Sequence, residues 1–368
     1  MAERIHAHLL IAFVNHVTLR GVRIYVGGQM NGSGGEALDG DAWPGDGDVV
    51  GVLARQDATR ARRAYPRTVI LGPVFAVVEQ AGNQWRVLRT GDFTPQGARD
   101  VLGSLLRGEA ARVGQSVGKE ATIKRAEFLA GARLLDWERH DELVVAERRF
   151  RVARVEEFVR FGPGGPEPPR PTDADPQPSW QGQRGADPAR EFMLSCEGPG
   201  SQGLLAERWD RLSADGRVPP EVWADARWAL VTHPEVAQLP ARFAVAEIRH
   251  DGRWRAITAA TISPQAARDT LAAYLYSTAS ATVAAGELEL ADEYAAAATV
   301  LQHRRLVGLA VADRTFQVIR VKQLMRFGAS GPEQPRRSDF DPDPPAEAAA
   351  GVPPEAGGSP GAPDPSVA

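Results

Sequence analysis

A long repeated segment constrains this chain more strongly than any motif in it. Residues 141–170 and 307–336 carry the same residue at sixteen of 30 aligned positions, with an offset of 307 − 141 = 166. Segments of ordinary composition would match by chance at roughly one position in fifteen. Two shorter upstream stretches also agree, FAVVE at 75–79 with FAVAE at 243–247, and PQGARDVL at 95–102 with PQAARDTL at 264–271. The sequence therefore predicts an internal duplication, in which two copies of one domain form a pseudo-two-fold pair.

The local patterns predict the α+β class for each copy, with a strand hairpin, two helices and a second hairpin in that order. Runs rich in β-branched and aromatic residues predict the first hairpins, at 69–71, 75–80 and 85–90 and again at 243–249 and 254–258. Alternation of apolar and polar residues predicts the second hairpins, at 143–146 with 150–155 and at 309–312 with 316–321.

Helix signals lie between these hairpins. Thr94-Pro95 and Ser263-Pro264 place an N-cap residue directly before a proline, which is typical of a helix start. A longer helix is expected to follow each of these. The expected helices cover residues 95–106, 119–138, 264–275 and 287–303.

Composition shifts predict the organisation of the rest of the chain. Segments rich in Pro, Gly, Ala and Asp cannot bury enough apolar surface to fold alone. The expected parts are a flexible leader at 1–56, the first copy at 57–161, a connector with a helical spacer at 162–223, the second copy at 224–340 and a disordered tail at 341–368. A short helix over 156–161 is expected to close the first copy. Residues 1–30 match nothing in the repeat, so Met1 and Met30 are both candidate start positions.

Charge and cysteine content narrow the class of protein. The 43 Lys and Arg against 47 Asp and Glu give a formal net charge of −4, without a concentrated basic stripe. A nucleic-acid binder needs such a stripe to neutralise phosphates, so the composition argues against that class. The single cysteine, Cys196, excludes an intrachain disulfide, and the apolar run at 9–14 is too short to span a membrane. We expect a cytoplasmic protein without a membrane segment; its oligomeric state stays open.

Polar residues present in both copies are the first candidates for a shared site. No histidine meets this condition; His140, for example, aligns with Leu306. Cys196 has no counterpart and no nearby base in the sequence. The stretch GPGSQG at 198–203 has the glycine spacing of a nucleotide loop but no following parallel strand. We therefore expect no catalytic residue, no metal ligand set and no cofactor.

Arginine and glutamate residues recur in both copies around a Gly/Pro-rich loop. Such a loop has no packing reason to carry charges, and two convergent arginines can hold a carboxylate or phosphate bidentately. The alternative is a structural role, in which Arg160 caps helix carbonyls and Glu167 pairs with Arg154 to pin the loop. The candidate ligand- or partner-binding residues are Arg154, Arg160, Glu167, Arg170, Arg320, Arg326, Glu333 and Arg336, with Asp173, Asp175, Asp339 and Asp341 just beyond.

The string ERRFRVARVEEFVRFGPGGPEPPRPTDAD at 147–175, with FAVVEQ, WRV and TPQGARDVL upstream, resembles a family of actinobacterial proteins described as a domain of unknown function. The likeness covers both copies. It implies a source with a GC-rich genome, in keeping with the many arginines, and supplies no activity or ligand. The second copy has Gln334 and Arg337 where the first has Pro168 and Pro171, so the two loops need not bind alike.

These observations favour a cytoplasmic, non-catalytic binding or regulatory module whose paired Arg/Glu loops recognise an unknown protein or a small anionic ligand. One alternative is an enzyme that acts on a phosphate- or carboxylate-bearing substrate through the same Arg, Glu and Asp residues. Another is a nucleic-acid-binding protein. Perturbed carboxylates in a deep pocket would favour the enzyme, and arginines gathered on one continuous face would favour nucleic-acid binding.

Overall fold

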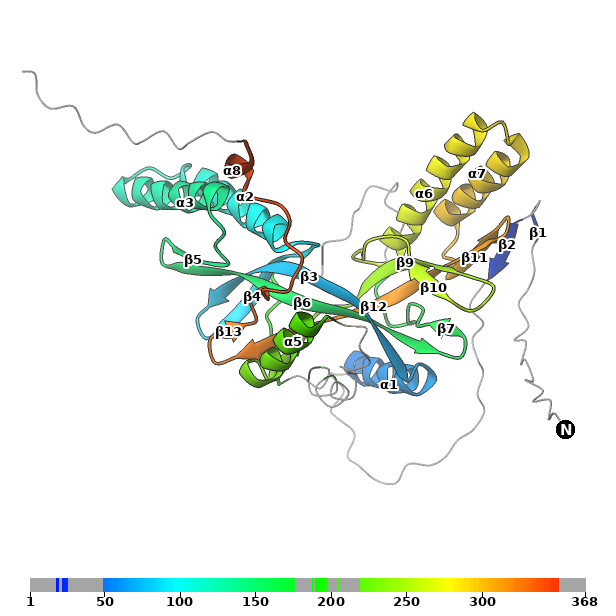
Figure 1. Cartoon of the computed structure of the whole chain (residues 1–368), viewed down its shortest axis with the longest axis horizontal. Coiled ribbons are helices and arrows are strands. Elements are labelled where there is room, and N and C mark those ends of the chain that lie inside the picture. The colour runs from blue at the N-terminus through cyan, green and yellow to red at the C-terminus, as the bar shows by residue number, and fades with distance from the viewer. Residues whose placement is uncertain are drawn as a thin grey trace, which may run out of the picture. The chain divides into compact units, whose positions relative to one another are not determined.

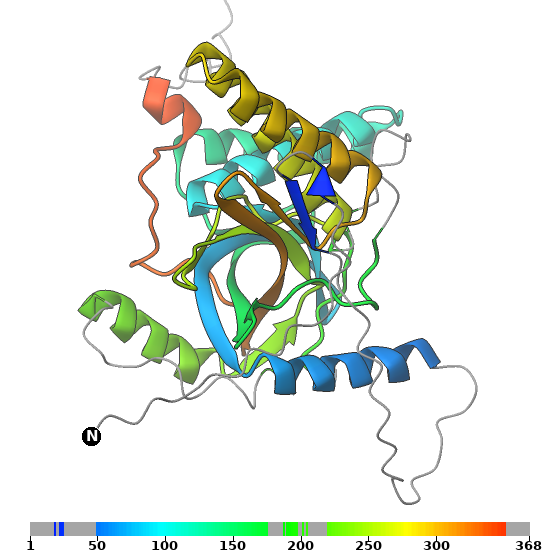
Figure 2. The same cartoon turned by 90° about the vertical axis from the view of Figure 1, so that its right-hand side faces the viewer.

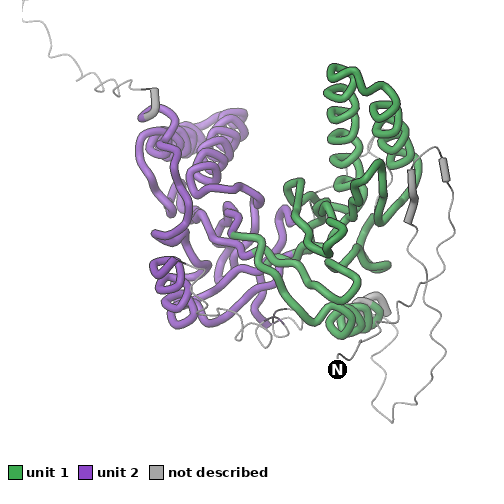
Figure 3. Tube along the Cα trace, turned by 45° about the vertical axis from the view of Figure 1, so that its right-hand side comes forward, with its two compact units in different colours: residues 1–72, 157–188, 240–323 green, residues 73–156, 189–239, 324–368 purple. Residues whose placement is uncertain are grey.

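The computed structural model combines helices and strands, and its contacts divide the chain into two compact units (Figure 3). The described backbone covers residues 18–19, 22–25, 49–175, 187, 189–197, 201, 204 and 219–350. Unit 1 comprises residues 1–72, 157–188 and 240–323, and unit 2 comprises residues 73–156, 189–239 and 324–368. Each unit therefore takes segments from both halves of the sequence.

Two series of elements follow one another along the chain (Figure 1). The first contains α1 (Val49–Ala64), β3 (Arg67–Ala81), β4 (Gln84–Asp92), α2 (Pro95–Val113), α3 (Lys119–Trp137), β5 (Glu142–Val145), β6 (Arg148–Gly162) and β7 (Gly165–Pro166). The second contains α5 (Pro220–Thr232), β8 (Glu235–Gln238), β9 (Arg242–Ile248), β10 (Trp254–Ala256), α6 (Pro264–Ala284), α7 (Leu288–His303), β11 (Gly308–Val311), β12 (Arg314–Gly328) and β13 (Gly331–Pro332). Outside these series lie β1 (Thr18–Leu19), β2 (Val22–Tyr25) and α8 (Ala346–Ala350).

The predicted helix starts are confirmed. Thr94 Oγ1 accepts a hydrogen bond from the Gly97 amide at 3.1 Å, and α2 begins at Pro95. Ser263 Oγ accepts from the Ala266 amide at 3.1 Å in the same way at the start of α6. Such side-chain acceptors satisfy amides that have no partner in the first helical turn. Both helices run beyond the predicted ends.

In unit 1 the helix pair α6 and α7 lies side by side and covers strands β9, β11 and β12 (Figures 1 and 2). The strand β12 pairs antiparallel with β9 on one side and with β11 on the other. Leu271, Leu275 and Leu301 from the helices pack with Phe316 from β12, and all four side chains are almost fully buried. Burial of such side chains stabilises the unit by about 1.5–3 kcal/mol each.

Unit 2 has a corresponding core beneath α2 and α3. Leu106 and Phe128 from these helices pack with Val77 of β3 and Phe150 of β6. Antiparallel pairs join β3 to β4 and β5 to β6, as the two predicted hairpins require. The strand β8 adds an antiparallel pair with the last residues of β12, from Leu324 onwards.

The strand β6 corrects one prediction, because it continues to Gly162 where a short helix was expected over 156–161. The apolar residues Val155, Phe158 and Val159 follow one another at spacings that also fit one face of a helix. In the structure almost every residue of this stretch is buried, so the strand has no solvent-exposed face. A strand buried on both faces lacks the alternation by which strands are recognised.

The ends of the long strands β6 and β12 approach the end of a helix so closely that only glycine fits. A Cβ at Gly162 would collide with the carbonyl oxygen of Ala64, the last residue of α1. A Cβ at Gly328 would collide with the carbonyl oxygen of Thr232, the last residue of α5. The glycine after each Arg-Phe pair therefore has a steric reason.

We expect Gly162→Ala to lower the free energy of unfolding by about 2–3 kcal/mol, because the strand end or the helix end must move. Gly164→Ala is the matched control, since a Cβ there meets nothing within 4 Å, and its effect should stay within about 0.5 kcal/mol. Urea denaturation followed by circular dichroism measures both. Equal stability of the two variants would contradict the close approach.

Candidate functional site

The eight candidate residues fall into two groups, one in each unit. Each group combines residues from both series of elements, because β6 and β12 pass from one unit to the other along the chain. Unit 1 contains Arg160, Glu167, Arg170 and Arg320, and unit 2 contains Arg154, Arg326, Glu333 and Arg336. The loop that follows each long strand therefore docks on a strand of the other series.

In unit 1 the loop after β7 is held against β12. The Arg320 amide donates to the Glu167 carbonyl at 2.8 Å, and Arg320 Nε lies 2.9 Å from Oδ2 of Asp173. Within the loop, Arg170 Nε donates to Glu167 Oε1 at 2.6 Å, and the Arg170 amide donates to Asp173 Oδ2 at 2.8 Å. Charge-assisted hydrogen bonds of this kind are about twice as strong as neutral ones.

In unit 2 the loop after β13 docks on β6 through the same set of contacts. The Arg154 amide donates to the Glu333 carbonyl at 2.8 Å, and Arg154 Nε lies 3.0 Å from Oδ1 of Asp339. Arg336 Nε donates to Glu333 Oε1 at 2.6 Å, and the Arg336 amide donates to Asp339 Oδ2 at 2.7 Å. Each residue in these contacts differs by 166 in number from the residue that makes the matching contact in unit 1.

A further ion pair ties each loop to a helix. Arg268 of α6 lies 2.6 Å from Asp175, and Arg99 of α2 lies 2.7 Å from Asp341. Asp341 is the first residue of the tail that the sequence predicts to be disordered, so unit 2 holds at least this residue. Residues 351–368 of that tail lie outside the described backbone.

The candidate side chains are buried rather than displayed on a surface. Arg160 is 2% exposed and Glu167 1%, and their counterparts Arg326 and Glu333 are each 4% exposed. The pairing of Glu167 with Arg154, offered as the structural alternative, is wrong, because Glu167 pairs with Arg170 and Arg154 pairs with Asp339. The contacts that are formed hold the loops in place.

In unit 2 the charges of this group are balanced by a glutamate on β6. Glu156 Oε1 accepts from Arg326 Nε at 3.1 Å and from Arg154 and Arg336 at 3.3 Å each. Its Oε2 accepts from Arg326 Nη2 at 3.2 Å. Burial raises the pKa of the Glu156 carboxyl, but the three arginines outweigh this effect and lower the pKa to about 2.

In unit 1 a lysine occupies the corresponding position, since 156 + 166 = 322. Lys322 is 8% exposed, and within the described part of the chain its ammonium group has no hydrogen bond or ion pair. Burial, followed by the charges of Arg160, Arg170 and Arg320, lowers the pKa of Lys322 to about 7. Arg170 Nη2 and Arg320 Nη1 are also buried without a hydrogen-bond partner among the described residues.

The two groups therefore differ in charge although their contacts agree. The unit 2 cluster, defined as Arg154, Glu156, Arg326, Glu333, Arg336 and Asp339, has three cations and three carboxylates, 3 − 3 = 0. The unit 1 cluster, defined as Arg160, Glu167, Arg170, Asp173, Arg320 and Lys322, has four cations and two carboxylates, 4 − 2 = +2. Asp57 of α1 also faces Arg170 but pairs with Arg60, so this pair adds no net charge. Lys322 is the residue that a search for shared polar positions misses.

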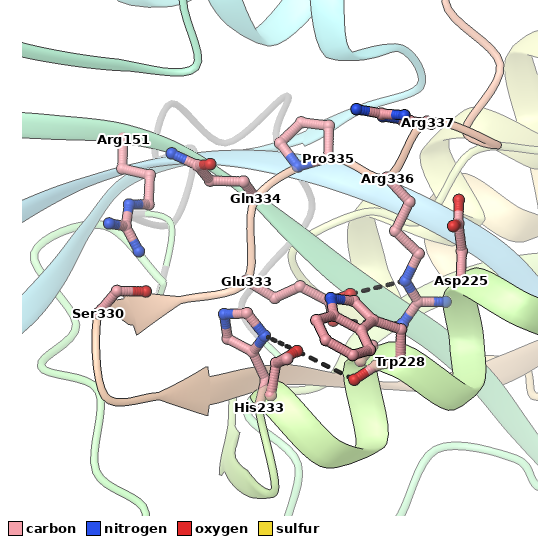
Figure 4. Close-up of a pocket in the computed structure, with 12 residues that line it drawn as sticks. Arg151, Asp225, Trp228, His233, Ser330, Glu333, Gln334, Pro335, Arg336 and Arg337 are labelled. Atoms are coloured by element: carbon pink, nitrogen blue, oxygen red, sulfur yellow. Dashed lines mark hydrogen bonds and ion pairs between the residues drawn. The ribbon is translucent and has the colours of Figure 1, made fainter.

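A cavity of about 280 Å³ adjoins the unit 2 cluster (Figure 4). Its lining includes Trp228 and His233 at the α5 side and Glu333 and Arg336 from the loop. Glu333 and Arg336 pair with each other, and Asp225, which also lines the cavity, accepts from the Ser338 amide at 3.0 Å. Three of the charged groups that line the cavity are thus already engaged in contacts within unit 2.

Burial, together with Glu235, raises the pKa of the Cys196 thiol to about 11, which keeps it protonated at neutral pH and weakly nucleophilic. The described residues contain no group of three or more His, Cys, Asp and Glu placed to hold a metal ion. No helix in the described part is both long and apolar enough to cross a bilayer.

Because the folded pKa of Glu156 lies below its ordinary value, the ionised carboxylate adds stability above about pH 5 that is lost as the pH falls towards 2. We expect this loss to be on the order of 2 kcal/mol for Glu156 alone. Glu156→Gln should lower stability at pH 7 and flatten the decline between pH 5 and 2. Urea midpoints across pH measure it, with the exposed Glu120→Gln as control; parallel curves for Glu156→Gln and the wild type would contradict it.

Comparisons with known proteins identify a family and no function. No curated protein and no solved structure matches the chain. The expected actinobacterial source stays a prediction. The resemblance to a family of unknown function is confirmed: the model of the family of unknown function DUF5954 matches residues 48–342, and the chain belongs to that family.

Proposed function

We propose that this protein is a non-catalytic binding module for a small anionic ligand and that the unit 1 cluster holds the ligand. The excess of positive charge in that buried cluster, +2 when Lys322 is protonated, carries the proposal. Buried charges are costly unless they are paired, and four cations near two carboxylates leave such a cost in place. An anion from solution is the simplest group that removes it.

The unit 2 cluster supports this proposal because it contains the same arginines around an anion of its own. Three arginines converge on the Glu156 carboxylate, and their counterparts in unit 1 are Arg160, Arg170 and Arg320. This arrangement of guanidinium groups can therefore bind an anion such as a carboxylate. In unit 1 Lys322 occupies that position instead of a glutamate, so under this proposal the bound anion comes from solution.

The duplication predicted from the sequence is part of the same proposal. We infer that the two series of elements descend from one ancestral unit and that position 156/322 has since diverged in charge. The equal spacing of the loop contacts in both units supports this inference. One copy then serves mainly to build the fold, and the other keeps a ligand site in a cytoplasmic, regulatory role.

Lys322→Glu tests the proposal, because it gives unit 1 the residue that unit 2 has and so supplies an internal anion. At a concentration near 100 times the dissociation constant, a bound anion adds about 2.7 kcal/mol, which corresponds to a rise in Tm of about 5–10 °C. We expect wild-type protein to show such a saturable rise with millimolar sulfate at constant ionic strength. The variant should show none and should already be more stable without sulfate.

Lys119→Glu is the matched control, since it makes the same change of charge at an exposed residue at the start of α3. It should respond to sulfate as the wild type does. If Lys322→Glu retained the saturable rise, the unit 1 cluster would not be the binding site and the proposal would be wrong.

A further inference from the structure

We infer that the ligand of the unit 1 cluster carries a doubly charged, tetrahedral oxyanion, the phosphoryl group of inorganic phosphate or of a phosphate monoester, rather than a carboxylate. This inference rests on the proposed function and specifies its ligand class. It follows from the charge of the cluster, from the number of its donors and from the position of Lys322.

The charge of the cluster matches a dianion. With Lys322 protonated, the six residues of the unit 1 cluster sum to +2, whereas one carboxylate already brings the unit 2 cluster to zero. A single carboxylate ligand would leave unit 1 with one uncompensated buried charge. A phosphoryl dianion neutralises the cluster, and buried charges are tolerated when they are fully paired.

The donors of the cluster also exceed what a carboxylate can accept. In unit 2 the two oxygens of Glu156 are already shared among three arginines at 3.1–3.3 Å. In unit 1 the available donors include Arg170 Nη2, Arg320 Nη1 and the ammonium of Lys322, which carries three hydrogens. Three terminal oxygens of a phosphoryl group provide acceptors for guanidinium and ammonium donors from several directions.

The donors come from separate elements, which surround a tetrahedral group better than a planar one. Arg320 and Lys322 lie on β12, and Arg170 lies on the loop after β7. All are at least about nine-tenths buried, so a bound anion would be shielded from salt. Burial and the neighbouring arginines lower the pKa of Lys322 to about 7, so a bound dianion should favour its charged form and draw a proton onto it.

Isothermal titration at pH 6.5 and constant ionic strength tests the ligand class. The probes are sulfate, inorganic phosphate, methyl phosphate, acetate and succinate. We expect sulfate and phosphate to bind at least tenfold more tightly than acetate and succinate, with one site per chain. Methyl phosphate binding as tightly as phosphate would identify the monoester as the natural class, and weak binding of methyl phosphate would identify the free ion.

Two failures can be told apart. If acetate or succinate binds as tightly as sulfate, and Lys322→Glu removes that binding, the ligand class is wrong while the proposed site stands. If no probe shows saturable binding that Lys322→Glu removes, the proposed function itself fails. Lys322→Gln gives the same comparison without introducing an acidic group, in case Lys322→Glu does not fold.

Sulfate binding also tests the role of Lys322, because sulfate stays doubly charged from pH 6 to 8. The other charged groups of the unit 1 cluster are Arg160, Arg170, Arg320, Glu167 and Asp173, and arginines and carboxylates as classes titrate far outside this range. Sulfate should therefore bind about tenfold more tightly at pH 6 than at pH 8, where most Lys322 is neutral. Lys322→Gln should remove this dependence; an unchanged dependence would overturn the role of the lysine.

Glu156→Lys provides the converse experiment. This substitution gives the unit 2 cluster the composition of the unit 1 cluster, so a folded variant should bind sulfate at two sites per chain instead of one. Circular dichroism checks that it is folded. A folded variant that still binds one sulfate would show that the residue at position 156/322 does not determine anion binding.

Discussion

Buried pairs between an arginine on a strand and a carboxylate on a loop determine how each unit is assembled. Arg320 with Asp173 and Arg154 with Asp339 join a strand of one series to the loop of the other. Taking two charges out of water is expensive, and loss of one partner leaves the other uncompensated, which costs about 3–5 kcal/mol. Each loop therefore has one docking position in which its buried charges are paired. Apolar packing alone would specify the docking position of the loop less strictly, because an apolar contact tolerates replacement by another side chain of similar volume.

This pairing makes each unit depend on both halves of the sequence. The strand β6 contributes Arg154 to unit 2 and then continues into unit 1, where Arg160 and the following loop lie. Gly162 is required at the end of that strand because the carbonyl oxygen of Ala64 leaves no room for a Cβ. The strand β6 is thus constrained in two ways, by the ion pairs of its arginines and by the lack of space at Gly162. A half of the sequence on its own would expose an unpaired strand arginine and lack the aspartate that neutralises it.

The helices α2, α3, α6 and α7 and the hairpins were predictable because their signals are local. The helix α1 was not: it begins at Val49, inside the segment 1–56 that was expected to be a flexible leader, so the end of that prediction is wrong. Thr94 and Ser263 accept hydrogen bonds in the first turns of α2 and α6, as their place before a proline indicates. The end of β6 was not predictable, because a strand buried on both faces has no alternation of polar and apolar residues. The docking of each loop on a strand of the other series was not predictable either, since both series carry the same arginines and aspartates in these positions and the sequence does not say which partners meet.

Lys322 was missed for the complementary reason, since a comparison that keeps identical residues discards the position where the copies differ in charge. Glu156 and Lys322 stand at matching places among matching arginines, and this reversal was visible in the sequence as one of three lysines in an arginine-rich chain. Under the proposed function, the reversal separates two tasks. The Glu156 carboxylate is part of the chain, so the unit 2 cluster is neutral at any ligand concentration. The unit 1 cluster reaches the same neutral state only with a bound anion, so its stability follows ligand concentration by mass action and links binding to folding.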